Sequence, residues 1–200
     1  MRPKNACMLL LTAFIWGTAF VAQSVGMDYL EPFTFNGVRC LIGAIALLPC
    51  IWFFNRGKEK ENKVNDENAK RDLIKGGIAC GILLFAASSL QQIGLVYTAA
   101  GKAGFITAFY IVLVPVFGVF LHKNIGWKVW TAVAIALAGL YFLCITEAFT
   151  IGVGDIYVLL CALIFSVHIL VVDHYAPKVD GVKLSCIQFL VAGIVSIPFM

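Results

Sequence analysis

Seven long apolar runs dominate this chain, and their length constrains the fold more than any other feature of the sequence. A helix rises about 1.5 Å per residue, so about 20 apolar residues are needed to cross the roughly 30 Å hydrocarbon core of a bilayer. The runs that meet or approach this length are 6–25, 33–54, 73–97, 99–121, 127–145, 154–172 and 184–200. Each spanning segment must satisfy its backbone hydrogen bonds internally, and runs of this length are too long for barrel strands. The sequence therefore predicts an all-α integral membrane protein, built as a multi-span helical bundle.

The composition excludes an ordinary soluble domain, because 61% of the 200 residues are hydrophobic and only 13% are charged. Soluble domains typically have about 25% charged residues. The net charge of +4 indicates a nucleic-acid partner only where it forms a basic face on a folded domain, and no such domain is expected here. The seven cysteines are scattered singly, without a CxxC pair. We expect no metal, no cofactor and no nucleic acid.

Lysine and arginine gather in alternate loops, which predicts the orientation of the chain. Residues 55–72 form the only long loop, and this loop is densely charged. With a cytoplasmic amino terminus, all basic residues except Lys102 and Arg39 fall on the cytoplasmic side, while Asp28 and Asp155 lie in outer loops. We therefore expect a multi-pass protein of the cell membrane whose amino terminus and charged loop are cytoplasmic.

The chain shows a weak internal repeat at an offset of 149 residues. Segment 10–16 aligns with 159–165, and the same offset pairs Pro49 with Pro198. Chance similarity is the alternative, since leucine and isoleucine match easily in any two apolar helices. The counterpart of the first run also argues against a cleaved signal peptide at the amino terminus.

A genuine repeat of this length contains five helices per unit, and an odd number of crossings inverts the second copy. Inverted repeats of this kind occur in many secondary transporters. We expect residues 1–145 to form the first five-helix repeat and residues 154–200 to form the first two helices of a second, inverted and incomplete repeat. Two full units would require about twice the offset of 149 residues, so the chain is expected to be a fragment that lacks three helices.

Several motifs, each weak alone, resemble a known family through their order and spacing. They are Trp16-Gly17, Asn36 with Arg39, the run 94–107, Pro115 and Ala138-Gly139. Together they resemble the EamA domain of the drug/metabolite transporter superfamily. The resemblance implies a ten-helix exporter of metabolites, amino acids or drug-like compounds, with a central substrate cavity and two cytoplasmic termini. The chain departs from that pattern by ending after the seventh run and by carrying Phe165-Ser166 where Trp16-Gly17 stands in the first unit.

Arg39 is the one Asp, Glu, Lys or Arg residue that no adjustment of boundaries moves out of an apolar run. A cation at this depth costs at least about 2.5 kcal/mol unless it is paired or hydrated. One interpretation is an anchor for an anionic or carboxylate-bearing substrate, because guanidinium binds carboxylates bidentately. The other is a structural arginine that snorkels or binds carbonyl groups of neighbouring helices.

Uncharged polar residues cluster on one half of the first three runs, and we expect them to face the bundle interior. They are Gln23, Asn36, Ser88, Ser89, Gln91 and Gln92. Substrate contact and interhelical hydrogen bonding are both consistent with this pattern. Trp16 and Tyr110 are candidates for the walls of a substrate cavity, with packing against neighbouring helices as the alternative.

Three further residues are candidates for gating or coupling. Lys102 lies at the outer end of the fourth run, where it either attracts substrate and gates its path or is a solvated lysine at a helix start. Pro115 removes a backbone hydrogen bond within that run, which predicts a local bend or an exposed carbonyl. His168 is a candidate for proton coupling, with snorkelling near the interface as the alternative.

The leading hypothesis is a secondary transporter, most simply an exporter that works by alternating access. Its expected partners are a small-molecule substrate and the lipid bilayer, with a homo-oligomer also possible. An enzyme is disfavoured because the chain lacks GxSxG and HExxH motifs and has no close carboxylate pair within its runs. The alternatives are a non-transporting structural or assembly factor and a seven-helix receptor-like protein, although a receptor would normally place its amino terminus outside.

Overall fold

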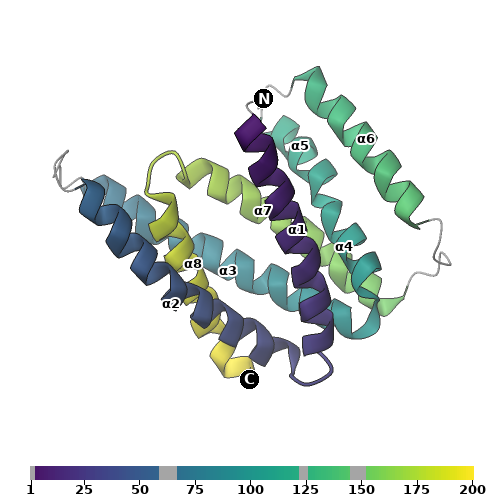
Figure 1. Ribbon diagram of the computed structural model, residues 1–200, viewed down its shortest axis with the longest axis horizontal. Coiled ribbons are helices and arrows are strands. Elements are labelled where there is room, and N and C mark those ends of the chain that lie inside the picture. Colours follow the sequence, from purple (N-terminus) through teal and green to yellow (C-terminus); the bar gives the residue numbers. More distant parts are fainter. Residues whose placement is uncertain (1–2, 59–66, 122–125, 145–151) are drawn as a thin grey trace.

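The chain forms a bundle of helices, in agreement with the predicted all-α membrane fold. The computed structural model describes residues 3–58, 67–121, 126–144 and 152–200, and no strand occurs among them. The helices are α1 (Pro3–Gly26), α2 (Pro32–Lys58), α3 (Glu67–Tyr97), α4 (Ala100–Ala108), α5 (Tyr110–Phe120), α6 (Trp127–Cys144), α7 (Val153–Tyr175), α8 (Gly181–Ser196) and the short 3₁₀ helix η1 (Ile197–Phe199). Figure 1 shows α5 and α6 along one edge of the bundle and the two ends of the chain at opposite edges.

Six helical segments in the described part of the chain are long and apolar enough to cross a membrane. The fourth of these segments, Ala100–Phe120, contains both α4 and α5. The remaining predicted run, 127–145, corresponds to α6, whose apolar part is the shorter stretch Trp127–Gly139, while residue 145 lies outside the described residues. The predicted runs therefore match the helices closely, because the apolar length needed to cross a bilayer can be counted from the residues themselves.

The predicted loop over residues 55–72 is wrong at both ends. Helix α2 continues to Lys58 and helix α3 already begins at Glu67, so only residues 59–66 lie outside the described helices. A helix can extend beyond the hydrocarbon core where its side chains meet water, and Glu67 stands four residues before Arg71, a spacing that favours helix. Hydropathy reports where the apolar stretch ends and not where the helix ends.

Helix α3 forms the centre of the bundle, packing against α7 and α8, while α8 also packs against α2. Glycines allow these close approaches. A Cβ atom added at Gly81 would lie 2.6 Å from Val191 Cβ and 2.9 Å from the backbone oxygen of Gln188, both on α8. At Gly94 an added Cβ would collide with Val158 of α7. Small residues at helix contacts are typical of membrane bundles, where backbones approach closely.

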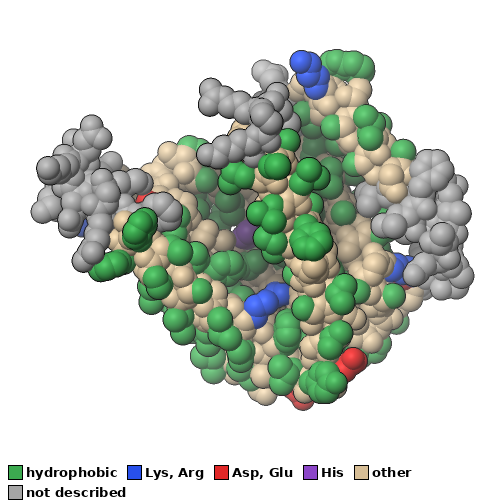
Figure 2. All heavy atoms as spheres, viewed as in Figure 1, with side chains coloured by type: hydrophobic (Ala, Val, Ile, Leu, Met, Phe, Trp, Pro, Cys, Tyr) green, Lys and Arg blue, Asp and Glu red, His purple; other side chains and the backbone are tan. Residues whose placement is uncertain are grey.

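The surface of the bundle is largely apolar. Helix α1 exposes Leu10, Phe14 and Val21, and helix α2 exposes Ile45 and Phe53. Figure 2 shows one face on which hydrophobic side chains predominate, with a basic side chain near its middle. Such an exterior suits contact with lipid chains, whereas the interior holds the polar groups described next.

Candidate functional site

Arg39 lies on α2 inside a membrane-spanning segment and binds two neutral amide oxygens. Its Nη1 donates to Gln23 Oε1 of α1 at 2.6 Å, and its Nη2 donates to Asn36 Oδ1, one turn earlier on α2, at 3.0 Å. The guanidinium carbon also lies 5.7 Å from the centre of the Phe35 ring. Among the described residues, no carboxylate lies within ion-pair distance of this guanidinium. Its positive charge is therefore hydrogen-bonded but not neutralised.

Two side chains of α3 extend this arrangement into a network that joins three helices. Gln92 Nε2 donates to the same Gln23 Oε1 at 2.6 Å, and Asn36 Nδ2 donates to Ser89 Oγ at 3.4 Å. Asn36 and Gln92 are both completely buried. We call Gln23, Asn36, Arg39, Ser89 and Gln92 the arginine network.

One atom of the arginine network lacks a partner. In the part of the chain that the structure describes, Gln92 Oε1 is the one fully buried side-chain nitrogen or oxygen atom without a hydrogen bond. An unsatisfied buried acceptor costs about 1–3 kcal/mol, so its presence in the interior calls for an explanation.

Other polar residues predicted for the site are buried but do not join the arginine network. The Ser88 hydroxyl donates to the backbone oxygen of Leu84 in its own helix, at 2.5 Å. Gln91 Nε2 donates to Thr107 Oγ1, which ties α3 to α4 at 3.1 Å. The Gln91 contact fits the interhelical bonding that was the alternative interpretation of the cluster, whereas Ser88 bonds within its own helix.

Trp16 and Tyr110 form an edge-to-face aromatic pair between α1 and α5, with ring centres 6.4 Å apart. Trp16 remains about half exposed and Tyr110 is partly buried. The pair supplies amphipathic surface, but within the described part of the chain neither ring is hydrogen-bonded to the arginine network.

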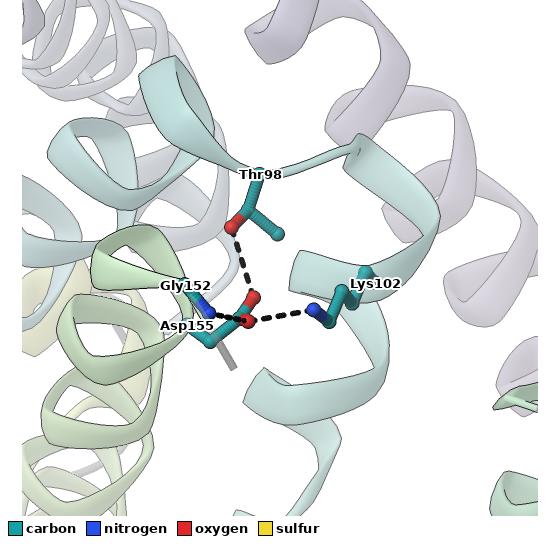
Figure 3. Close-up of polar contacts among 4 residues, drawn as sticks. All are labelled: Thr98, Lys102, Gly152 and Asp155. Carbon is teal, nitrogen blue, oxygen red and sulfur yellow. Dashed lines mark hydrogen bonds and ion pairs between the residues drawn. The ribbon is translucent and has the colours of Figure 1, made fainter. Parts of the chain in front are cut away.

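A second polar cluster, which we call the Asp155 cluster, joins α4 to α7 (Figure 3). Lys102 Nζ lies 2.6 Å from Asp155 Oδ2, and Thr98 Oγ1 donates to Asp155 Oδ1 at 2.9 Å. The backbone N–H of Gly152 donates to Asp155 Oδ2 at 2.8 Å. Asp155 stands in the first turn of α7, where the helix dipole favours a carboxylate.

The Asp155 cluster corrects two expectations. Asp155 is not in an outer loop, because α7 begins at Val153 and the Asp155 side chain is only 7% exposed. Lys102 is not simply solvated, since its side chain is 24% exposed and ion-paired. The pairing was missed because the two residues lie 53 positions apart. The available signal was a carboxylate three residues after Gly152, at the start of an apolar run.

The two remaining gating candidates have different surroundings. His168 of α7 is buried, and its Nε2 lies 3.1 Å from Gln188 Oε1 of α8. Pro115 is buried inside α5, which continues through it. The interruption of the fourth span is instead at Phe109, six residues earlier, where α4 ends and α5 begins. A proline ring crowds the carbonyl four residues earlier, here that of Ile111 within α5, so Pro115 does not account for the break at Phe109.

The fold and the buried clusters define a multi-pass helical membrane protein with hydrogen-bonded polar groups inside its bundle, which is the organisation of a solute transporter. Residues 4–145 match the model of the EamA-like transporter family, and the chain belongs to this family. An "Uncharacterized transporter" of Archaeoglobus fulgidus is 34% identical over 194 residues, which cover 96% of this chain. The chain spans 56% of the length of that relative. No solved structure matches the chain significantly.

Proposed function

We propose that the intact protein is a secondary transporter that exports a small solute by alternating access, and that the arginine network is its substrate site. The observation that carries this proposal is the cation of Arg39, which lies within a membrane-spanning helix, donates to two amide oxygens and has no carboxylate partner among the described residues. A membrane cation costs at least about 2.5 kcal/mol, and bonds to neutral groups offset only part of an ion's desolvation. A substrate that brings an anionic group would complete the site.

The packing of α2 against α8 supports an inverted repeat. Leu41 of α2 meets Gly193 of α8, and Cys186 Sγ of α8 donates to the backbone oxygen of Ala44 at 3.6 Å. At the offset of 149 residues, Gly193 corresponds to Ala44 and Cys186 corresponds to Gly37. Leu41 thus lies against the equivalent of Ala44, and Ala44 lies against the equivalent of Gly37.

These pairs place the crossing of α2 and α8 near the same position in both helices, around residue 42 and its equivalent in the second unit. A two-fold axis between two units of opposite orientation requires this register. The axis exchanges the two helices, so they must cross at equivalent positions. The crossing therefore supports two inverted units related across α2 and α8, the arrangement in which one unit can rock against the other.

The Asp155 cluster lies between the same two units and would serve as a gate in this mechanism. Thr98 and Lys102 belong to the first unit, and Asp155 belongs to the second. Gly152 lies just before the second unit begins. Alternating access requires contacts at each end of the substrate path to form and break in turn. We place the cluster on the outer side, following the predicted cytoplasmic amino terminus.

The direct test is export by cells that carry the intact gene, measured by comparing their released metabolites with those of a deletion strain. Arg39→Ala should abolish the difference while the protein inserts normally. The matched control is Arg71→Ala, which removes an exposed arginine near the amino-terminal end of α3, before the predicted apolar run 73–97, and should leave export unchanged. Unchanged export kinetics in Arg39→Ala would contradict the proposed site, and identical metabolite profiles with and without the gene would instead favour a non-transporting assembly factor.

A further inference from the structure

The direction of every hydrogen bond in the arginine network is fixed by Arg39. A guanidinium has donors only, so the atoms that it contacts on Gln23 and Asn36 must be the amide oxygens. Gln23 Oε1 accepts from Arg39 and from Gln92 Nε2 at the same distance, 2.6 Å. Turning the Gln92 amide around would set two oxygens against each other. The unpartnered atom of Gln92 is therefore an acceptor by necessity.

Gln92 Oε1 offers this acceptor in a place that water does not reach from outside, because the Gln92 side chain is 0% exposed. A ligand group that completes it must be a hydrogen-bond donor, since two acceptors repel one another. The network thus presents a cation and an acceptor together. Its preferred ligand combines an anion for Arg39 with a donor for Gln92.

The two groups are close enough for one small ligand. Arg39 Nη1 and Gln92 Nε2 share the acceptor Gln23 Oε1, with both bonds 2.6 Å long, so these nitrogens are at most twice that distance apart. Gln92 Oε1 belongs to the same amide group as that nitrogen. A donor on the carbon next to a carboxylate can span such a separation, because each hydrogen bond at its ends adds about 2.7–3 Å.

The charge of the site distinguishes between the two common donors on the carbon next to a carboxylate, an ammonium group and a hydroxyl group. An ammonium group would place a second cation beside the guanidinium, and like charges disfavour one another most where water is excluded. In the described residues, no carboxylate contacts Arg39 that could offset the added charge. A hydroxyl group donates without bringing charge, and it leaves the ligand with the single negative charge that matches Arg39.

On the basis of the proposed transport function, we propose that the arginine network binds a 2-hydroxy monocarboxylate, with the carboxylate on Arg39 and the hydroxyl donating to Gln92 Oε1. The hydroxyl is recognised by the orphaned acceptor and the net charge by the un-neutralised guanidinium. The site is expected to discriminate against the corresponding amino acid and against the corresponding acid that lacks the hydroxyl.

Lactate, propionate and alanine test this proposal, because they share a three-carbon skeleton and differ only in the hydroxyl, hydrogen or ammonium group at the second carbon. Their dissociation constants are measured on the purified intact protein by calorimetry, with thermal stabilisation as a second readout. We expect lactate to bind about tenfold more tightly than either of the other two, in the range of one hydrogen bond gained at a buried acceptor.

Variants at Gln92 separate recognition of the hydroxyl from general affinity. Gln92→Leu should remove the preference for lactate over propionate while propionate still binds through Arg39. Gln188→Leu removes a glutamine of α8 that contacts His168 rather than the arginine network and should preserve the tenfold ratio.

Equal binding of lactate and propionate, tighter binding of alanine, or absence of binding by all three would overturn the proposal. A preference that survives in Gln92→Leu would also overturn it, because a group other than Gln92 Oε1 would then recognise the hydroxyl. If Gln92→Leu fails to fold, the ratios of the unaltered protein decide. If the expected binding ratios are not found but Arg39→Ala still abolishes export, the proposed function stands and only the choice of ligand is wrong. If the deletion strain releases the same metabolites as cells with the intact gene, the proposed function itself is wrong.

Discussion

The Lys102–Asp155 ion pair allows a quantitative test of how strongly α4 is held to α7. The Asp155 carboxylate accepts three hydrogen bonds, from Lys102 at 2.6 Å, Gly152 at 2.8 Å and Thr98 at 2.9 Å. A hydrogen bond to a charged group contributes about 1.5–3 kcal/mol, and a fully exposed ion pair contributes at most about 1 kcal/mol. Because Asp155 is nearly buried and Lys102 is a quarter exposed, we expect a coupling energy of about 2 kcal/mol.

A double-mutant cycle measures this coupling without counting other contacts of either side chain. Lys102→Met, Asp155→Asn and the double variant are compared with the unaltered protein by reversible unfolding in mixed detergent micelles. Lys102→Met should be the more destabilising of the single variants, because it leaves a buried carboxylate with two neutral donors. Thr98→Val is the control; it removes one hydrogen bond to the charged carboxylate and should cost about 1.5–3 kcal/mol.

A coupling energy within about 0.5 kcal/mol of zero would refute the reasoning, since distant and independent sites show values of that size. It would mean that solvent screens the pair despite the burial of Asp155. A coupling near 2 kcal/mol would correspond to about a thirtyfold change in the folding equilibrium.

Two further predictions concern packing and topology. Gly81→Val should destabilise the bundle by about 1–3 kcal/mol because the added atoms collide with α8, whereas Gly139→Ala, which meets nothing within 4 Å, should be neutral or stabilising in the same unfolding assay. The second prediction uses a variant whose exposed native cysteines are replaced and which carries one new cysteine at a time. A cysteine at position 28 or 153 should react with an impermeant thiol reagent from outside the cell, and one at position 178 should react only after the membrane is opened. Labelling of positions 28 and 153 from different sides would contradict the predicted orientation.

The sequence predicts the spans well because crossing a bilayer imposes a length and an apolar character that single residues report directly. It also identifies the interior polar residues, because exposing an amide such as that of Asn36 to lipid would cost free energy, which favours its burial inside the bundle. The sequence of one helix does not determine which neighbouring helix each of its polar side chains faces. Gln91 and Gln92 are adjacent and chemically identical, yet one contacts Thr107 on α4 and the other contacts Gln23 on α1.

Contacts between distant parts of the chain were the least predictable features. Lys102 reaches Asp155 because the glycine-rich contact between the end of α3 and the start of α7 draws the two helices together, as at Gly94 and Gly154. No periodicity within one helix reports such an approach. The break at Phe109 was missed because the residue that signals an interruption in this run, Pro115, lies six positions further on, inside a continuous α5.

The order of residues in the arginine network bears on how the protein enters the membrane. Gln23 and Asn36, the two groups that bind Arg39, both precede it in the chain. When α1 and α2 leave the ribosome, this hairpin already contains the amide oxygens that solvate the guanidinium, before Gln92 of α3 has emerged. The costliest side chain of the spans can therefore be inserted together with its own ligands, and the later helices enter a membrane in which that cost has already been reduced.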